Sequence, residues 1–179
     1  MGQSYIWNDE AIQARLNELA SAESQCNREI SALKTAMYQV QTQLTTISNK
    51  ITELTNKQTE YTNLKISLET LKADLDALSS SINGVVTNLN NMGEGNVIDG
   101  ILTKLGQRGM TVGAKIDAIN SINASIDAKL KSIQDELKRL NSQKDYLTKE
   151  IERNQQIIAN KETMLSGIRE EVKSLVTSY

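Results

Sequence analysis

Acidic residues are the side chains in this chain most capable of chemistry, because closely spaced carboxyl groups can act as general acid and base. The close pairs are Asp74 with Asp76, Asp135 with Glu136, and Glu170 with Glu171. In a long helix such residues usually form a solvated face, where a lysine four positions away, as in Asp145 and Lys149, stabilises them. The chain also has no His, which removes the commonest general base. We therefore expect a protein that is not an enzyme, with no catalytic residue.

Metal and cofactor chemistry also lack their usual residues. Cys26 is the single cysteine, so the chain offers neither an internal disulfide nor, without His, the ligands of a structural zinc site. The stretch GEGNVIDG, residues 93–100, is rich in glycine but lacks the Lys-Ser/Thr of a phosphate-binding loop. We expect no metal and no cofactor.

Charge and hydropathy narrow the classes of partner. The formal net charge is -2, without the basic excess that phosphate contacts require, so no nucleic-acid partner is expected. No apolar run approaches the length of a membrane span, and no secretory signal is present. The expected location is cytoplasmic, with export possible by a route that uses no cleavable signal peptide.

The composition favours helices. Aromatic residues make up 3% of the chain, there is no Phe, and there is no Pro at any position. Long helices tolerate this composition, and any core must be aliphatic. We predict an all-α fold.

A seven-residue repeat of apolar positions runs through the first half of the chain. Its members are Leu19, Cys26, Leu33, Val40, Ile47, Leu54, Tyr61, Leu68, Leu75, Ile82 and Leu89. A repeat of this length predicts a supercoiled helix, because a straight helix of 3.6 residues per turn would rotate the stripe away from its partner.

A companion stripe changes phase midway. It begins at Leu16 and Ile30 but becomes polar at Gln58, Lys65, Lys72 and Ser79, while apolar residues reappear at Leu64, Leu71, Leu78 and Val85. Such a shift overwinds a coiled coil or turns the helix toward another neighbour. We expect a packing irregularity near residues 58–64, where the continuity of the first helix is left open.

The second half carries two cleaner stripes, which begin at Val112 and Ile116. Their breaks are Asn123, Lys144, Asn154 and Lys161. Polar residues at seam positions can fix register or partner choice at a cost in stability. The alternative is that these residues lie where the seam is wet or frayed.

Glycines mark the point where the chain reverses. The four that we assign to the tip of the hairpin are Gly93, Gly95, Gly106 and Gly109. A glycine after the last seam residue can take the left-handed conformation that ends a helix. We predict that Asn96 caps a short helix over residues 97–105, that Gly106 closes this helix, and that Thr111 caps the second long helix.

Together these features predict a single domain, a long antiparallel helical hairpin over residues 1–179. Its first helix covers about residues 9–92, its tip residues 93–110, and its second helix about residues 111–178. Apolar residues beside the seam, such as Ile66 and Ile122, widen the apolar face. The hairpin is therefore expected to form a homo- or hetero-oligomer, with a four-helix bundle as one form.

Trp7 is the only Trp, and it stands just before Asn8 and Asp9, two residues that can cap the first helix. One interpretation is a structural staple at this helix start. The other is a partner-binding anchor, because Trp is enriched among interface hot spots.

A helix, a glycine-containing turn and a second helix without a signal peptide resemble the helical-hairpin proteins of Gram-positive type VII secretion. The similarity is greater to the longer proteins encoded beside LXG-domain effectors than to the short WXG-type members. Tyr146-Leu-Thr-Lys-Glu150 matches the aromatic-x-x-x-acidic export motif of these families, and Asn91-Met92-Gly93 stands where Trp-x-Gly is usual.

This resemblance implies an adaptor that binds the helical domain of a cognate effector and helps its export. Seam-flanking apolar residues would contact the effector, while Tyr146 and Glu150 would belong to the surface that the secretion ATPase reads. The competing hypothesis is a structural coiled-coil spacer or scaffold, such as a phage, secretion-apparatus or cytoskeletal component, that works by self-association.

Overall fold

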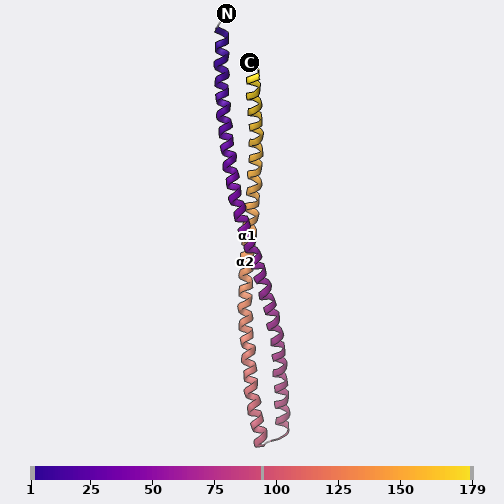
Figure 1. The fold of residues 1–179 in the computed structure, drawn as a ribbon. Coiled ribbons are helices and arrows are strands. Elements are labelled where there is room, and N and C mark those ends of the chain that lie inside the picture. The colour runs from indigo at the N-terminus through magenta and orange to yellow at the C-terminus, as the bar shows by residue number, and fades with distance from the viewer. Residues whose placement is uncertain (1–2, 94, 178–179) are drawn as a thin grey trace. The chain divides into compact units, whose positions relative to one another are not determined.

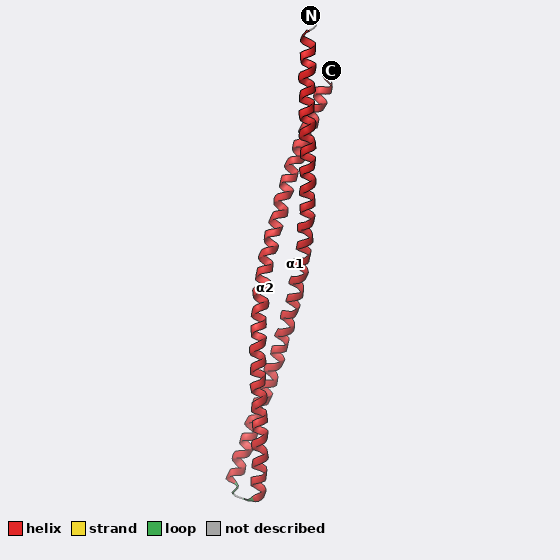
Figure 2. Cartoon of the chain, turned by 90° about the vertical axis from the view of Figure 1, so that its left-hand side faces the viewer, coloured by secondary structure: helices red, strands yellow, loops and turns green. Residues whose placement is uncertain are grey.

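The computed structural model contains two long helices that pack against each other as a hairpin (Figure 1). Helix α1 spans Gln3–Asn91 and helix α2 spans Asn96–Thr177. The structure describes residues 3–93 and 95–177, with side chains from residue 10 onward, and these ranges contain no strand (Figure 2). The predicted all-α coiled-coil hairpin is confirmed.

Helix α1 begins earlier than the sequence predicted, at Gln3 and not near residue 9. Asn8 and Asp9 therefore lie within the helix and do not cap it, because no proline or glycine between Gln3 and Asp9 opposes helix formation. The backbone of Trp7 belongs to α1, whereas its side chain lies outside the described residues.

The turn begins where the first glycine of the tip was expected to end the helix. Gly93 has a φ of 100°, a left-handed value that glycine adopts without strain. The amide of Met92 donates to the carbonyl of Leu89 over 3.1 Å, and the amide of Asp99 donates to that of Gly95 over 3.0 Å. The predicted helix end at Gly93 is confirmed. The predicted cap at Asn96 is wrong, because the Gly95 carbonyl accepts the first hydrogen bond of α2 and Asn96 already lies within the helix.

The predicted separate short helix is wrong, since α2 continues through Gly106, Gly109 and Thr111 without a break (Figure 2). An interior glycine costs a helix about 1 kcal/mol relative to alanine. Leu105 and Val112, however, continue the seam across this stretch as half-buried and buried residues, and fully burying such a side chain stabilises by about 1.5–3 kcal/mol. Packing therefore outweighs the glycine penalty.

The chain divides into two compact units, which are described separately. The terminal unit comprises residues 1–50 and 140–179, and the tip unit comprises residues 51–139. The terminal unit buries apolar side chains from both helices: Leu19, Cys26, Ile30, Val40 and Ile47 from α1, and Leu140, Leu147, Ile158 and Leu165 from α2. Cys26, Ile30, Ile158 and Leu165 form one cluster, as the predicted stripes require.

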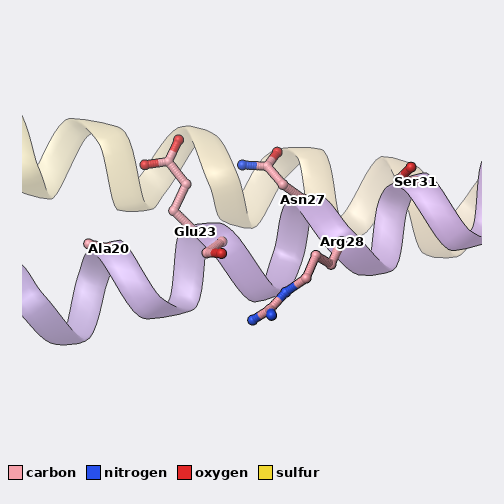
Figure 3. Close-up of a pocket in the computed structure, with 6 residues that line it drawn as sticks. Ala20, Glu23, Asn27, Arg28 and Ser31 are labelled. Carbon is pink, nitrogen blue, oxygen red and sulfur yellow. The ribbon is translucent and has the colours of Figure 1, made fainter.

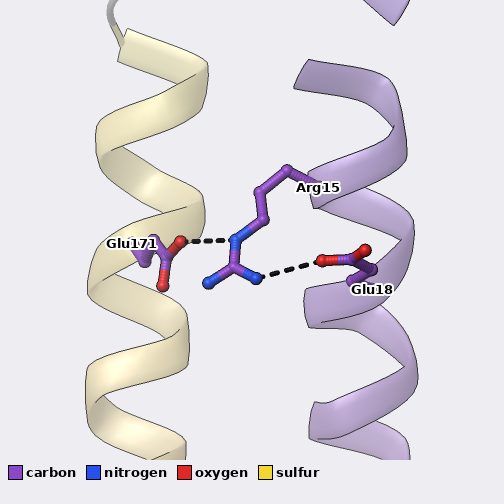
Figure 4. A network of polar contacts seen from close by, with 3 residues as sticks. All are labelled: Arg15, Glu18 and Glu171. Atoms are coloured by element: carbon purple, nitrogen blue, oxygen red, sulfur yellow. Dashed lines mark hydrogen bonds and ion pairs between the residues drawn. The ribbon is translucent and has the colours of Figure 1, made fainter. Parts of the chain in front are cut away.

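Ion pairs border this apolar seam of the terminal unit. Those that join the two helices are Arg15–Glu171, Glu23–Arg169, Glu29–Lys161 and Lys34–Glu162. The Arg15 guanidinium lies between Glu171 of α2, at 2.8 Å, and Glu18 of its own helix, at 3.0 Å (Figure 4). The Glu171 and Glu18 carboxylates raise the pKa of the Arg15 guanidinium. Opposite charges thus flank the seam of the terminal unit on both helices.

The four polar breaks of the α2 stripes have different environments. Asn154 is buried, Lys161 is half-buried and pairs with Glu29, and Lys144 is exposed. In the tip unit, the side-chain oxygen of Asn123 is buried and accepts no hydrogen bond from the described residues. Asn123, Asn154 and Lys161 therefore occupy the seam. Lys144 lies in contact with solvent, as the alternative interpretation of these polar breaks expected.

The tip unit is less apolar at its seam. Among the described residues of α1 in this unit only Ile82 is buried, whereas α2 buries Val112, Ile119, Ile126 and Ile133. Gln58, Lys65, Lys72 and Ser79 are half-buried on α1. Helix α1 is continuous through residues 58–64, and its seam keeps the seven-residue step. The expected change of phase is wrong, because α1 stays in step with the regular stripes of α2.

Candidate functional site: an exposed apolar stripe

Because α1 keeps the seven-residue step of its seam, a row of large aliphatic side chains stays outside the seam of the tip unit. Leu64, Leu71, Leu78 and Val85, here called the Leu64 stripe, are between 46% and 48% exposed. They are seven residues apart and therefore lie on one face of α1. Contiguous exposed apolar surface marks an interaction site more often than scattered residues do.

Two contacts between the helices of the tip unit show which side of α1 the Leu64 stripe occupies. The Lys65 ammonium pairs with Asp127 at 2.6 Å, and the Lys129 ammonium lies 3.4 Å from the Tyr61 hydroxyl and 5.5 Å from the ring centroid. Leu64 follows Tyr61 by three residues and Lys65 follows it by four. At 3.6 residues per turn, the two side chains therefore lie on opposite sides of Tyr61 around the helix. Leu64 therefore lies on the side of Lys129.

On α2, residues that precede Lys129 in steps of seven share this side. They are Ile122, Lys115, Arg108 and Ile101, all exposed. Tyr61, Ile122 and Lys129 line one shallow hollow between the helices, which confirms that these side chains lie together. Among the described residues, Arg108 and Lys115 form no ion pair. Arg108, Lys115 and Lys129 are here called the basic edge.

The other border of the Leu64 stripe is acidic. Glu60 precedes Leu64 by four residues, and Asp74 lies three residues after Leu71 and four before Leu78, so both neighbour the stripe on the helix surface. Both are exposed. Glu60 and Asp74, here called the acidic edge, lie on the side of the stripe away from α2. An apolar ridge between charges of opposite sign is suited to binding another amphipathic helix.

The predicted export motif lies in the terminal unit. Tyr146 is 67% exposed and Glu150 is half-buried, one helical turn apart on α2. The structure thus presents both side chains on adjacent turns of one face, in a unit separate from the Leu64 stripe. Trp7, the third predicted partner-binding residue, has a side chain outside the described residues.

One member of each acidic pair considered for catalysis takes part in an ion pair. Glu136 pairs with Arg139 at 2.7 Å, Asp76 with Lys72 at 3.8 Å, and Glu171 with Arg15. The Glu136 carboxylate accordingly raises the pKa of the Arg139 guanidinium. These carboxylates therefore belong to the charged outer faces of the helices, as their spacing predicted.

A hollow of about 540 Å³ lies along α1 in the terminal unit and is lined by Ala20, Glu23, Ser24, Asn27, Arg28 and Ser31 (Figure 3). All six residues come from successive turns of one helix. Glu23 is already bound by Arg169 over 2.8 Å. The hollow is the polar outer surface of a helix, with no facing element to enclose a ligand.

The described part of the chain holds no cluster of three or more potential metal ligands among its Cys, Asp and Glu residues. Neither described helix contains a stretch that is both long and apolar enough to cross a membrane.

Sequence reasoning noted the residues of the Leu64 stripe but did not recognise them as an exposed surface. The available signal was the coexistence of two repeats, one polar through Lys65 and Lys72 and one apolar through Leu71 and Leu78. The basic edge was missed entirely, although its lysines recur in steps of seven with Ile101 and Ile122.

No protein-family model, no curated protein and no solved structure matches the chain.

Proposed function

We propose that this protein is a non-enzymatic adaptor that binds the helical domain of a cognate effector and helps its export by type VII secretion. The observation that carries the proposal is the Leu64 stripe, four large aliphatic side chains that are nearly half exposed along one face of α1. A partner helix that covered them would remove apolar surface from water, which is the main favourable term in association. The resemblance of the hairpin to type VII secretion proteins supplies the class of partner.

Co-expression with a candidate effector tests the binding step. The double variant Leu71→Ser with Leu78→Ser should lose the effector in a pull-down, because polar side chains interrupt the centre of the stripe. The matched control is Tyr38→Ser with Met164→Ser, which removes two exposed side chains of the terminal unit that lie outside the stripe. Equal recovery of the effector with both variants would refute this binding surface.

The export step is assigned to Tyr146 and Glu150. Tyr146→Ala and Glu150→Ala should each leave effector binding intact and reduce secretion of the effector, since the two side chains lie outside the tip unit. Tyr38→Ala serves as the control, because Tyr38 is another exposed tyrosine of the terminal unit. Unchanged secretion with both variants would remove the motif from the proposal.

A second candidate function, a structural scaffold that works by self-association, is favoured by the charges beside the stripe. The acidic edge and the basic edge lie on opposite sides of one apolar ridge. A surface of this kind can complement itself.

A further inference from the structure

We propose that a second copy of this chain covers the Leu64 stripe in the isolated protein. The two tip units would lie parallel and in register, related by a two-fold axis that runs along the helices. This inference goes beyond the adaptor function, and it concerns the same surface.

The apolar residues of the tip unit supply the first reason. The Leu64 stripe alternates with Leu68, Leu75, Ile82 and Leu89 of the seam, so the two sets together repeat with steps of three and four residues. This is the pattern of a coiled-coil seam. Helix α2 covers the side that carries Lys65 and Lys72, and the α1 helix of a second copy fits the side that carries Leu71 and Leu78.

The charged edges supply the second reason, because the proposed symmetry sets the acidic edge of each copy against the basic edge of the other. Lys129 contacts Tyr61 and is therefore level with Glu60. Lys115 precedes Lys129 by two heptads, and Asp74 follows Glu60 by two heptads, so in an antiparallel hairpin Lys115 is level with Asp74. Each copy thus contributes one half of two kinds of ion pair, Glu60 with Lys129 and Asp74 with Lys115.

Charge also selects the direction of pairing. In an antiparallel two-fold arrangement of the stripe, Leu71 of one copy would lie opposite Leu78 of the other. The two-fold axis would then pass beside Asp74, so Asp74 of one copy would face Asp74 of the other copy. Like charges placed opposite each other are destabilising, so the parallel arrangement is favoured.

The same spacing limits the length of the interface. The position seven residues before Leu64 is Lys57, so the apolar repeat stops there. One heptad beyond the Glu60–Lys129 pair, the residues that would face each other are Glu53 and Glu136, which carry the same charge. The proposed contact therefore ends near Glu60 and stays within the tip unit.

The mass of the full chain in solution is the first test. Sedimentation equilibrium should give twice the chain mass of 19.8 kDa. Leu71→Ser with Leu78→Ser should give the monomer mass with unchanged helicity by circular dichroism, since neither side chain is buried within the hairpin. The control Tyr38→Ser with Met164→Ser should remain a dimer. A monomeric wild-type chain would overturn the inference.

Charge reversal tests the edges separately from the apolar stripe. Glu60→Lys with Asp74→Lys, and separately Lys115→Glu with Lys129→Glu, should each raise the dimer Kd by about tenfold or more, as expected for the loss of several exposed ion pairs. An equal mixture of the two variants restores every pair and should form a heterodimer. Failure of the mixture to associate more tightly than either variant alone would refute the charge pairing.

A disulfide tests the direction. Cysteines bridge only when their Cα atoms lie within about 7 Å. In the parallel dimer, Leu71→Cys of one copy should therefore crosslink to Leu71→Cys of the other copy. The parent chain, whose Cys26 is buried in the terminal unit, is the control and should not crosslink. Crosslinking that required a mixture of Leu71→Cys with Leu78→Cys would indicate the antiparallel arrangement and refute the proposal.

The outcomes separate this inference from the adaptor function. A monomer that captures an effector through Leu71 and Leu78 would refute the self-association and leave the adaptor standing. A dimer that binds no effector would do the reverse.

Discussion

The two units of the hairpin use the same repeat differently. In the terminal unit both helices contribute buried apolar residues, and four ion pairs join the helices across the borders of the seam. In the tip unit α1 contributes Gln58, Lys65, Lys72 and Ser79 to the same seam positions, while the Leu64 stripe stays exposed.

Two helices are therefore enough to cover the apolar stripes of the terminal unit, whereas they leave the Leu64 stripe of the tip unit uncovered. The terminal unit matches apolar to apolar and charge to charge within the chain. In the tip unit, α1 carries apolar residues on a wider arc than one neighbouring helix can cover. An arc of this width is typical of a helix with two neighbours.

The largest effect should come from truncating side chains of the two units in parallel. Leu165→Ala, in the buried cluster of the terminal unit, should lower the free energy of unfolding by about 2–4 kcal/mol through lost burial and a residual cavity. Leu71→Ala should lower it by less than about 1 kcal/mol when the chain is monomeric, because the side chain is already nearly half exposed. Urea denaturation at low protein concentration measures both. Equal losses would contradict the contrast between the units.

A seam lysine of the tip unit offers a gain in stability. Lys72→Leu should raise the free energy of unfolding by about 1–2 kcal/mol, because an apolar side chain replaces a half-buried charge between the helices. Lys131→Leu is the control, since Lys131 is an exposed lysine of the same unit. The measurement is the thermal midpoint by circular dichroism. A midpoint that rises equally in both variants would show that the seam position of Lys72 is not special.

The sequence predicted the hairpin, the two long helices and the buried residues of the terminal unit, because a seven-residue repeat has one simple structural solution. It did not predict the register of the tip unit. Two repeats overlap there on α1, and the choice between Lys72 and Leu71 as the seam residue depends on the helix that packs opposite. The continuity of α2 at Gly106 was missed for a similar reason, since packing of Leu105 and Val112 outweighs local glycine preference.

Two glycines near the turn should respond to the same substitution with opposite signs. Gly93→Ala should destabilise by about 1 kcal/mol, because an L-residue at a φ of 100° is strained. Gly106→Ala should stabilise by about 0.5–1 kcal/mol, since it lies within α2 and an added Cβ would meet no atom within 4 Å. Thermal unfolding of the two variants measures the difference. A gain with Gly93→Ala would show that this residue does not hold the left-handed turn.

The smallest effect should come from the ion pairs that border the seam of the terminal unit. The Lys161 ammonium, with the Gln25 amide, lowers the pKa of Glu29 below its usual value of 4.5. A depressed folded pKa adds stability above the unfolded pKa, and this stability is lost as the pH falls through the folded value. The wild-type chain should therefore melt slightly above Glu29→Gln at pH 7, and this difference should shrink as the pH falls below 4.5.

Salt and a matched variant identify the cause of that small difference. High salt should narrow the gap at pH 7, because exposed charges are screened. Glu170→Gln is the control and should leave the midpoint at pH 7 unchanged, since Glu170 has no ion pair among the described residues. A gap between wild type and Glu29→Gln that widened as the pH fell would contradict the assigned sign. The Glu29–Lys161 pair would then add no stability to the terminal unit, and its neighbours in the apolar cluster would hold the helices together at that level.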